Sequence, residues 1–228
     1  RVEPYITQSN GGIMSISSTI QTPVQTALSG PSAGVMGAVY VAKAAGFLDI
    51  ITYDMGGTST DVSLVKDGIA EYTTKRKVCG LPSGVPMIDV HAVGAGGGSI
   101  AHIDNAGALK VGPESAGANP GPVAYNLGNE QPVVTDANLV LGRINPHYVL
   151  GGRLKIDAQL SRAAMKKQIA DPMGLSVEAA AQGVISVVNS NMARAIRVIT
   201  VEKGHNPSDF TLVAYGGAAL GIALAVVE

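Results

Sequence analysis

The sequence predicts an α/β fold, because stretches with the 3.6-residue period of helices alternate with short runs of β-branched residues. Of the 228 residues, 46% are hydrophobic and only 14% are charged, so the chain can bury a sizeable core. The net charge is −1 and no long basic run is present, which argues against a dedicated binder of nucleic acids or anionic membranes. We therefore expect no nucleic-acid partner and no membrane partner.

Cysteine content and the two ends of the chain give further expectations. Cys79 is the single cysteine, which excludes an intramolecular disulfide and favours a reducing compartment, so we expect a cytoplasmic location. Because the chain begins with Arg1, we expect it to be a piece of a longer protein. Residues 212–227 are uncharged, but this run is shorter than the ~20 residues that a spanning helix needs and is interrupted by glycines. We expect a buried strand, a turn and a helix there.

In the first third of the chain we expect one helix followed by three strands. Residues 22–46 have helical apolar spacing, and Ser29-Gly30-Pro31 is typical of a helix start. Residues 49–53 form a short β-branched run. Residues 62–66 and 69–75 are predicted as two further strands joined by an Asp-Gly turn.

The middle of the chain differs in character from both ends. Residues 78–152 are rich in glycine and proline, so we expect a long insertion in which regular structure is short. Such a segment is usually functional when it is not disordered. Helices are predicted for residues 157–170 and 176–203, the second with Ser176 as its N-cap. Residues 211–215 complete the predicted elements as a strand in the same mixed sheet as those near residues 49–75.

The strongest local motif is the string Asp54-Met55-Gly56-Gly57-Thr58-Ser59-Thr60-Asp61. Two glycines let the backbone approach a ligand closely, and successive N–H groups of such a turn form an anion-binding nest. A carboxylate beside a bound phosphate requires a cation between them, so Asp54 indicates Mg²⁺ held mostly through water. The alternative is a solvated Gly-Gly turn with capping hydroxyl groups.

Two weaker motifs lie in the glycine-rich part. The loop Gly94–Ser99 has backbone amides that could face a phosphate or a developing oxyanion; the alternative is a flexible loop without a ligand. Asp89 and His91 lie two residues apart, on one face of a strand, so they could bind a metal ion together with Asp136 or His147. Most such pairs are instead ordinary surface or core groups.

Several strings together resemble a known family. The Asp54 string is similar to the second phosphate loop of the sugar kinase, Hsp70 and actin superfamily. Six strings spread along the chain between residues 29 and 218 resemble the hydantoinase A/5-oxoprolinase family: SGPSAGV at 29–35, DMGGTSTD at 54–61, VGAGGGSIA at 93–101, VGPESAGA at 111–118, TDANLVLGR at 135–143 and VAYGGA at 213–218. The resemblance implies a ribonuclease-H-like, actin-like ATPase lobe with a mixed sheet and flanking helices, formed by residues 1–228.

The resemblance also implies an activity. Members of that family use ATP to open cyclic amides such as hydantoins and 5-oxoproline, with a B-type partner subunit or domain completing the hydrolysis after the carbonyl oxygen is phosphorylated. The alternatives are an acetone or acetophenone carboxylase β subunit, or a non-catalytic nucleotide-gated protein. Because the family's first phosphate loop has no counterpart here, we expect the second lobe alone, with the first lobe absent and the fragment by itself inactive.

The site residues follow from the resemblance and from the motifs. Asp54 and Asp61 are the expected catalytic residues, and Asp54 would hold Mg²⁺ through water. The expected ATP-binding residues are Gly56, Gly57, Thr58, Ser59, Thr60, Gly96, Gly97, Gly98, Ser99, Gly216 and Gly217, the last two at the nucleoside. Residues 218–223 lack the Gly-Pro and the His that the family carries after this turn, so no role of that His is carried over.

Overall fold

The computed structural model describes residues 3–219 of the chain, which divide into two compact units. The first unit comprises residues up to Asp54, Asp61–His91 and Ile196–Val213. The second comprises Met55–Thr60, Ala92–Ala195 and the residues from Ala214 onward. The helix expected after the 216–217 turn falls on residues 220–228, outside the described part.

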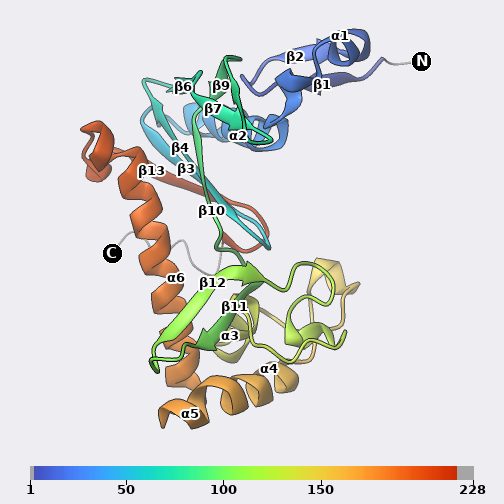
Figure 1. Ribbon diagram of the computed structural model, residues 1–228, viewed down its shortest axis with the longest axis vertical. Coiled ribbons are helices and arrows are strands. Elements are labelled where there is room, and N and C mark those ends of the chain that lie inside the picture. The colour runs from blue at the N-terminus through green and yellow to red at the C-terminus, as the bar shows by residue number, and fades with distance from the viewer. Residues whose placement is uncertain (1–2, 220–228) are drawn as a thin grey trace. The chain divides into compact units, whose positions relative to one another are not determined.

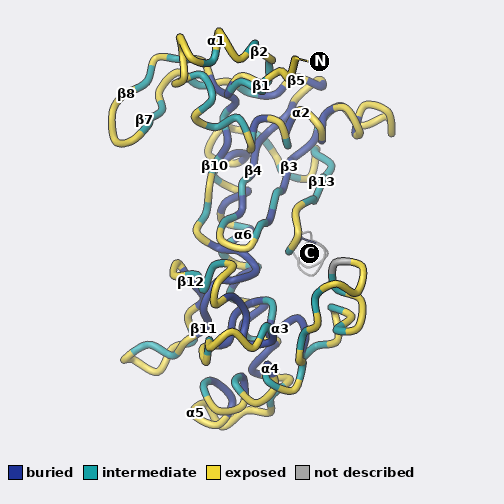
Figure 2. Tube along the Cα trace, turned by 90° about the vertical axis from the view of Figure 1, so that its right-hand side faces the viewer, coloured by how far each residue is buried: buried dark blue, intermediate teal, exposed yellow. Residues whose placement is uncertain are grey.

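The first unit contains most of the main sheet, whose strands lie in the order β10-β4-β3-β13, with β5 paired to β4. Apolar residues fill both faces of β3 and β4, which is why Figure 2 colours most of these two strands as buried. The main-sheet strands are β3 (Ile50–Met55), β4 (Thr60–Lys66), β5 (Ile69–Ala70), β10 (Val90–Val93) and β13 (Thr211–Tyr215). The prediction that residues 49–53, 62–66 and 211–215 share one sheet is therefore confirmed.

Helix α2 and several short elements complete the first unit (Figure 1). Helix α2 (Ser29–Ala44) confirms the predicted helix start, and it buries Val35, Ala38, Val39 and Ala42 along one face. The short elements are β1 (Tyr5–Thr7), β2 (Ile13–Ser15), α1 (Ile16–Gln21), β6 (Tyr72–Thr73), β7 (Arg76–Val78), β8 (Leu81–Ser83), β9 (Met87–Ile88) and 3₁₀ turns at Pro23–Thr26, Val201–Lys203 and Pro207–Asp209.

The predicted single strand over residues 69–75 is wrong. Ile69 and Ala70 pair with β4, whereas Tyr72 and Thr73 pair with β9 in a different sheet. Met87 and Ile88 of β9 are fully buried, so the chain leaves β4 to cover this apolar strand. The hairpin between β4 and β5 is present as predicted, with Val65 opposite Ala70.

The second unit is built from a β-hairpin and helices. Strand β11 (Ser99–Ile103) pairs antiparallel with β12 (Leu109–Ser115), and β11 contacts α3 (Val134–Val140). Helix α3 in turn packs on α4 (Ala158–Met165), as Figure 1 shows. The remaining elements are α5 (Asp171–Met173), a π-helical segment Lys166–Ala170, α6 (Val177–Ile199) as far as Ala195, and 3₁₀ turns at Val123–Tyr125 and Leu150–Gly152.

The expectation that regular structure is short over residues 78–152 is confirmed, since no helix or strand there exceeds seven residues. The hairpin β11–β12 and helix α3 both lie there, because the glycines cluster in the turns between elements. Gly107, for example, occupies the hairpin turn with φ +81°, a conformation that favours glycine. Residues 78–91 belong to the first folded unit, and residues 92–152 belong to the second, which continues to Ala195.

Helix α6 corresponds to the long helix predicted for residues 176–203. Ser176 Oγ accepts a hydrogen bond from Ala179 N at 3.1 Å, which confirms it as the N-cap. Residues 177–203 are long and apolar enough, by length and composition, to cross a membrane. Within α6 a stripe of apolar side chains is instead buried in the protein: Ala181, Val184, Ile185, Val188, Met192 and Ile199.

Candidate functional site

The turn Gly56–Ser59 follows β3 and presents backbone N–H groups without acceptors. Gly56 N donates to Ser59 O at 3.0 Å, which closes the turn. Across residues 3–219, no acceptor is found for the N–H groups of Gly57, Thr58 and Ser59. Three successive open amides form a nest suited to an anion such as a phosphate group. We call this segment the open turn.

The hydroxyl groups beside the open turn are not equivalent. Thr60 is fully buried, and its Oγ1 donates to Ala95 O at 2.7 Å. This corrects the expectation that Thr60 binds phosphate, because its hydroxyl hydrogen is already used inside the second unit. Thr58 is exposed and Ser59 is partly exposed, so their hydroxyl groups remain reachable from solvent.

Backbone N–H groups of the loop Gly94–Ser99 donate hydrogen bonds to acceptors inside the protein. Gly97 N donates to Gly56 O at 3.0 Å and Gly98 N donates to Gly57 O at 2.6 Å. Gly96 N donates to Ser99 Oγ at 2.8 Å, and Ser99 N donates back to Gly96 O at 3.1 Å. The expectation that these amides face a phosphate or an oxyanion is therefore not supported. The loop instead holds the open turn from behind, and we call it the bracing loop.

The glycines of the bracing loop are required by the closeness of the two backbones. A Cβ at Gly96 would lie 2.7 Å from Gly57 O and 2.8 Å from Gly56 O. A Cβ at Gly98 would lie 2.9 Å from Gly57 O. Real side chains essentially never approach backbone oxygens so closely, so only glycine fits at either position.

The Gly216-Gly217 turn is tied to the same place. Ala218 N donates to Met55 O at 3.0 Å, so the turn after β13 is fixed to the end of β3. Gly216 has φ +95°, which favours glycine, and both glycines are exposed. A Cβ at Gly97 would meet the Ala218 Cβ at 3.0 Å. The open turn, the bracing loop and the 216–217 turn are therefore contiguous within the second unit.

A cavity of about 520 Å³ adjoins this assembly, and we call it the α3 cavity. Gly217 and Ala218 form part of its wall, and Thr135 and Asn138 of α3 form another part. Its remaining lining residues are Tyr125, Arg143, Ile144, Asn145, Tyr148, Val149 and Ile156. Such a volume falls in the usual range of roughly 300–1,000 Å³ for small-molecule sites.

Two residues of α3 connect the bracing loop to the rest of the second unit. Thr135 donates to Gly97 O from both its backbone N and its Oγ1, each at 2.8 Å. The fully buried Asp136 carboxylate accepts hydrogen bonds from three backbone N–H groups at 3.0 Å, those of Val123, Ala124 and Val133. It also accepts one from Ser161 Oγ at 2.6 Å. Asp136 is thus fully occupied as a structural anchor and does not serve as a metal ligand.

Asp54 and Asp61 lie in the first unit at the ends of β3 and β4, and both are half-buried. Burial raises the pKa of Asp54. Burial also raises the pKa of Asp61, as does the negative charge of Asp54, whereas Arg76 opposes this rise. The two carboxylates therefore repel each other in a partly desolvated setting. A divalent cation would relieve this repulsion, so the donor set fits Mg²⁺ with its remaining ligands from water and phosphate.

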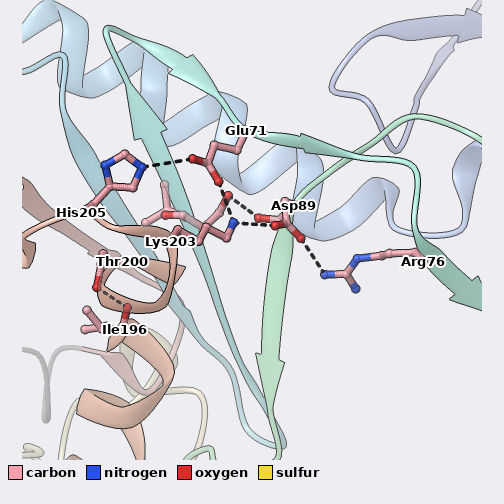
Figure 3. A network of polar contacts seen from close by, with 9 residues as sticks. Glu71, Arg76, Asp89, Ile196, Thr200, Lys203 and His205 are labelled. Carbon is pink, nitrogen blue, oxygen red and sulfur yellow. Dashed lines mark hydrogen bonds and ion pairs between the residues drawn. The ribbon is translucent and has the colours of Figure 1, made fainter. Parts of the chain in front are cut away.

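Asp89 belongs to an ion cluster rather than to a metal pair with His91 (Figure 3). Lys203 Nζ contacts Asp89 Oδ2 at 2.7 Å and Glu71 Oε2 at 2.6 Å, and Arg76 contacts Asp89 at 3.7 Å. Burial lowers the pKa of Lys203, but hydrogen bonds to Asp89 and Glu71 outweigh this effect and raise it. No three His, Cys, Asp or Glu side chains are grouped as metal ligands within residues 3–219. The predicted metal role of Asp89 and His91 is therefore not supported.

Sequence reasoning missed the roles of Thr135, Asn138 and Ala218. Each lies beside residues distant in the chain. The available signals were the strings at 135–143 and 213–218, which the resemblance included without assigning a role to any of these three residues.

Comparison with known proteins decides the family. The model of the hydantoinase/oxoprolinase family matches residues 1–228. The chain belongs to the hydantoinase/oxoprolinase family. It is 45% identical over 212 residues to caprolactamase subunit alpha from Pseudomonas jessenii, covering 93% of this chain and 30% of that protein.

Solved structures agree with this assignment. A nucleotide-free structure of acetone carboxylase, from work on ATP-dependent acetone carboxylation, matches with a TM-score of 0.89 and 36% identity, covering 99% of this chain and 32% of that one. The ATP-dependent caprolactamase from Pseudomonas jessenii matches with a TM-score of 0.87 and 41% identity, covering 100% of this chain and 33% of that one. The α/β fold with a mixed sheet is thus shared, and the chain spans about a third of the length of these relatives.

Proposed function

We propose that this chain is one nucleotide-binding lobe of an ATP-dependent enzyme that opens a cyclic amide, and that the lobe is of the actin-like type. One observation carries the proposal. The hydrogen bond from Ala218 N to Met55 O holds the exposed Gly216-Gly217 turn next to the three open amides of residues 57–59. One feature suits phosphate and the other suits close approach of a nucleoside, so a nucleotide can span both.

Each residue then has a defined task. The open amides of Gly57, Thr58 and Ser59 would bind phosphate oxygens. Asp54 would hold Mg²⁺ through water, where the ion neutralises phosphate charge. Asp61 would orient a further water molecule beside it. Gly216 and Gly217 would lie against the nucleoside.

The proposed reaction transfers the γ-phosphoryl group of ATP to the carbonyl oxygen of the amide. The bond between this group and ADP breaks as the new P–O bond forms, so the amide carbon becomes electrophilic. Water then adds to that carbon, and the C–N bond breaks with proton transfer to nitrogen, which leaves an acyl phosphate. A second water molecule hydrolyses the acyl phosphate to the carboxylate and inorganic phosphate. Phosphoryl transfer depends mainly on positioning and charge neutralisation, which are what a nest of amides and a Mg²⁺-binding carboxylate supply.

A second candidate is an ATP-dependent carboxylase subunit, which the similarity to acetone carboxylase favours. In that case ATP would activate bicarbonate or a ketone enolate with the same phosphate-binding groups. A non-catalytic nucleotide-gated protein gains no support, since the relatives described above are named as enzymes. Because two relatives are named as subunits, caprolactamase subunit alpha and the acetone carboxylase beta subunit, a hydantoinase B-type partner would complete the proposed enzyme.

The test is ATP turnover by the complete enzyme that carries this chain. Turnover stimulated by 5-oxoproline, hydantoin or caprolactam supports the hydrolase, and turnover that requires bicarbonate and a ketone supports the carboxylase. The control is the Asp54→Asn variant, which should abolish stimulation in either case. Absence of ATP turnover with every substrate and with the partner subunit present would refute both enzymatic proposals.

A further inference from the structure

Asn138 is a buried polar side chain without a hydrogen-bond partner, at the wall of the α3 cavity. The residue is 3% exposed. Its Oδ1 is buried, and no donor reaches it from any part of residues 3–219. Leaving a buried amide oxygen without a donor destabilises a protein, so such a group calls for a specific explanation. Asn138 lines the α3 cavity, and rotation of its amide about χ2 would turn Oδ1 toward a ligand there, which would provide one.

We infer that Asn138 selects the base of the bound nucleotide by recognising an amino-bearing purine edge, as in adenine. This inference rests on the proposed nucleotide site. The cavity wall includes Gly217, which the proposed function places at the nucleoside, so the base is the part of the nucleotide that reaches Asn138.

The chemistry of the side chain selects between bases. An asparagine amide carries a donor, Nδ2, beside an acceptor, Oδ1, and rotation about χ2 decides which of them faces the cavity. Adenine offers the matching edge, an N6 amino donor beside the N7 acceptor, and pairs with asparagine through two hydrogen bonds. Guanine offers two acceptors there, O6 and N7, so one of the two bonds is lost and two oxygens face each other.

The rest of the lining suits a flat ring. Tyr125 and Tyr148 supply aromatic faces and Arg143 a planar cation, which are the groups that stack on nucleobases. Burial and the negative charge of Asp136 raise the pKa of Tyr125, so its hydroxyl group stays protonated and can donate a hydrogen bond. Ile144, Val149 and Ile156 supply apolar contacts for the ring.

The experiment compares nucleotides in the complete enzyme with the Asn138→Leu variant. Leucine has a similar volume and no polar atom, so it removes the unpartnered oxygen without leaving a void. We measure kcat/KM for ATP, for GTP and for purine riboside triphosphate, which lacks the 6-amino group. The wild type should prefer ATP, and the variant should lose this preference by roughly ten-fold or more, as expected when a bidentate pair is removed. Its melting temperature should stay the same or rise.

Asn189→Leu is the matched control. Asn189 also has a buried Oδ1 without a partner, but it lies on α6 and does not line the α3 cavity. Its replacement should leave the nucleotide preference unchanged. If Asn138→Leu does not fold, Asn138→Ala is used for the same measurement.

Each outcome decides between the alternatives. Unchanged preference in the Asn138 variants, or a wild type that treats the three nucleotides alike, overturns the inference while leaving the proposed function standing. A variant with a lower melting temperature and an equal loss of kcat/KM for all three nucleotides indicates a structural role of Asn138, which also overturns the inference. A wild type that turns over no nucleotide overturns the proposed function and the inference with it.

Discussion

The two glycine-rich segments of this chain have similar composition and opposite hydrogen-bonding states. In the open turn Gly56–Ser59, the N–H groups of Gly57, Thr58 and Ser59 find no acceptor within residues 3–219. In the bracing loop Gly94–Ser99, the N–H groups of Gly96, Gly97, Gly98 and Ser99 all donate inside the protein. One segment therefore offers a surface to an anion, and the other fixes the position of that surface.

The difference shows what a glycine string does and does not predict. Glycine permits close approach of a backbone, but the approaching group can be a ligand or another segment of the same chain. At Gly96 the neighbours are the carbonyl oxygens of Gly56 and Gly57. At Gly57 a Cβ would meet nothing within 4 Å. Identifying the acceptor of each backbone N–H group distinguishes these two cases, which amino-acid composition alone cannot do.

The largest effect is expected from Gly96→Ala in the bracing loop. The new methyl group would collide with two backbone oxygens at 2.7 and 2.8 Å, so the open turn must move. Overpacking of this kind typically costs about 1–3 kcal/mol, and the displaced amides should reduce ATP turnover to background. Denaturant unfolding and steady-state turnover measure the two consequences.

Gly57→Ala in the open turn is the matched change. Its Cβ would point into open space, so stability should be unaffected while the KM for ATP rises because the methyl group obstructs the phosphate. If both glycine variants lose stability alike, or if Gly96→Ala behaves as the wild type, the contrast between the two segments is incorrect.

The next largest effect is expected from Asp54→Asn. Turnover should fall by roughly 100-fold or more, because a charge placed to stabilise the reacting phosphate through Mg²⁺ is lost. The melting temperature should not fall. Retained turnover would exclude the metal-binding role, and a turnover loss that only parallels a lower melting temperature would indicate a structural carboxylate.

The pH dependence of stability gives Asp54 a second test. Burial raises its pKa above the unfolded value, so the ionised form is disfavoured in the folded state. A group of this kind contributes stability below its unfolded pKa and loses that contribution as the pH rises through the folded pKa. Asp54→Asn should therefore equal or exceed the wild type in stability at pH 7, and this advantage should vanish in acid.

A smaller effect is expected at Thr60, the residue after the open turn, whose hydroxyl group contacts the bracing loop. Thr60→Val removes the donor to Ala95 O inside the second unit and should destabilise by about 1–3 kcal/mol. Thr58→Val removes an exposed hydroxyl group at the open turn and should change the KM for ATP without changing stability. Thermal unfolding together with KM measurements distinguishes them, and equal effects on stability would contradict the assignment of Thr60 to bracing.

The smallest effect is expected outside both glycine segments, at Asp89. Asp89→Asn leaves Lys203 with Glu71 as its remaining carboxylate in the cluster and should cost about 1 kcal/mol or less. The Mg²⁺ concentration required for half-maximal turnover should be unchanged. A marked rise in that concentration would restore the metal role that the ion cluster argues against.

Much of the fold could be predicted because local signals were strong. Pro31 near the start of α2 and Ser176 before α6 are local features of helix ends, and the elements begin where expected. The split between β5 and β6 could not be predicted, since it depends on pairing with β9, which is not a neighbour in the chain. Likewise β12 contains Gly112 and Pro113, two residue types that are rare inside strands, so residue preferences alone do not predict a strand there.

The candidate site was predictable only where its residues are contiguous in the sequence. The open turn is a contiguous string, so its residues could be named from the sequence. The roles of Thr60 and of the bracing loop could not, because each depends on which acceptor lies opposite a donor in the folded chain. Asn138 stands in the string at 135–143, but its role could not be predicted, since an asparagine inside a helix looks alike in sequence whether its amide is satisfied or not.

The hydrogen bond from Ala218 N to Met55 O has a consequence for the order in which the protein matures during synthesis. The ribosome releases the open turn long before it releases residue 218, and the bracing loop appears between them. Contacts between residues so far apart in sequence close slowly, because a long loop must be ordered first. A nascent chain therefore exposes the open turn without the Ala218–Met55 contact until residue 218 has left the ribosome, and nucleotide added before that stage should not protect the turn from proteolysis.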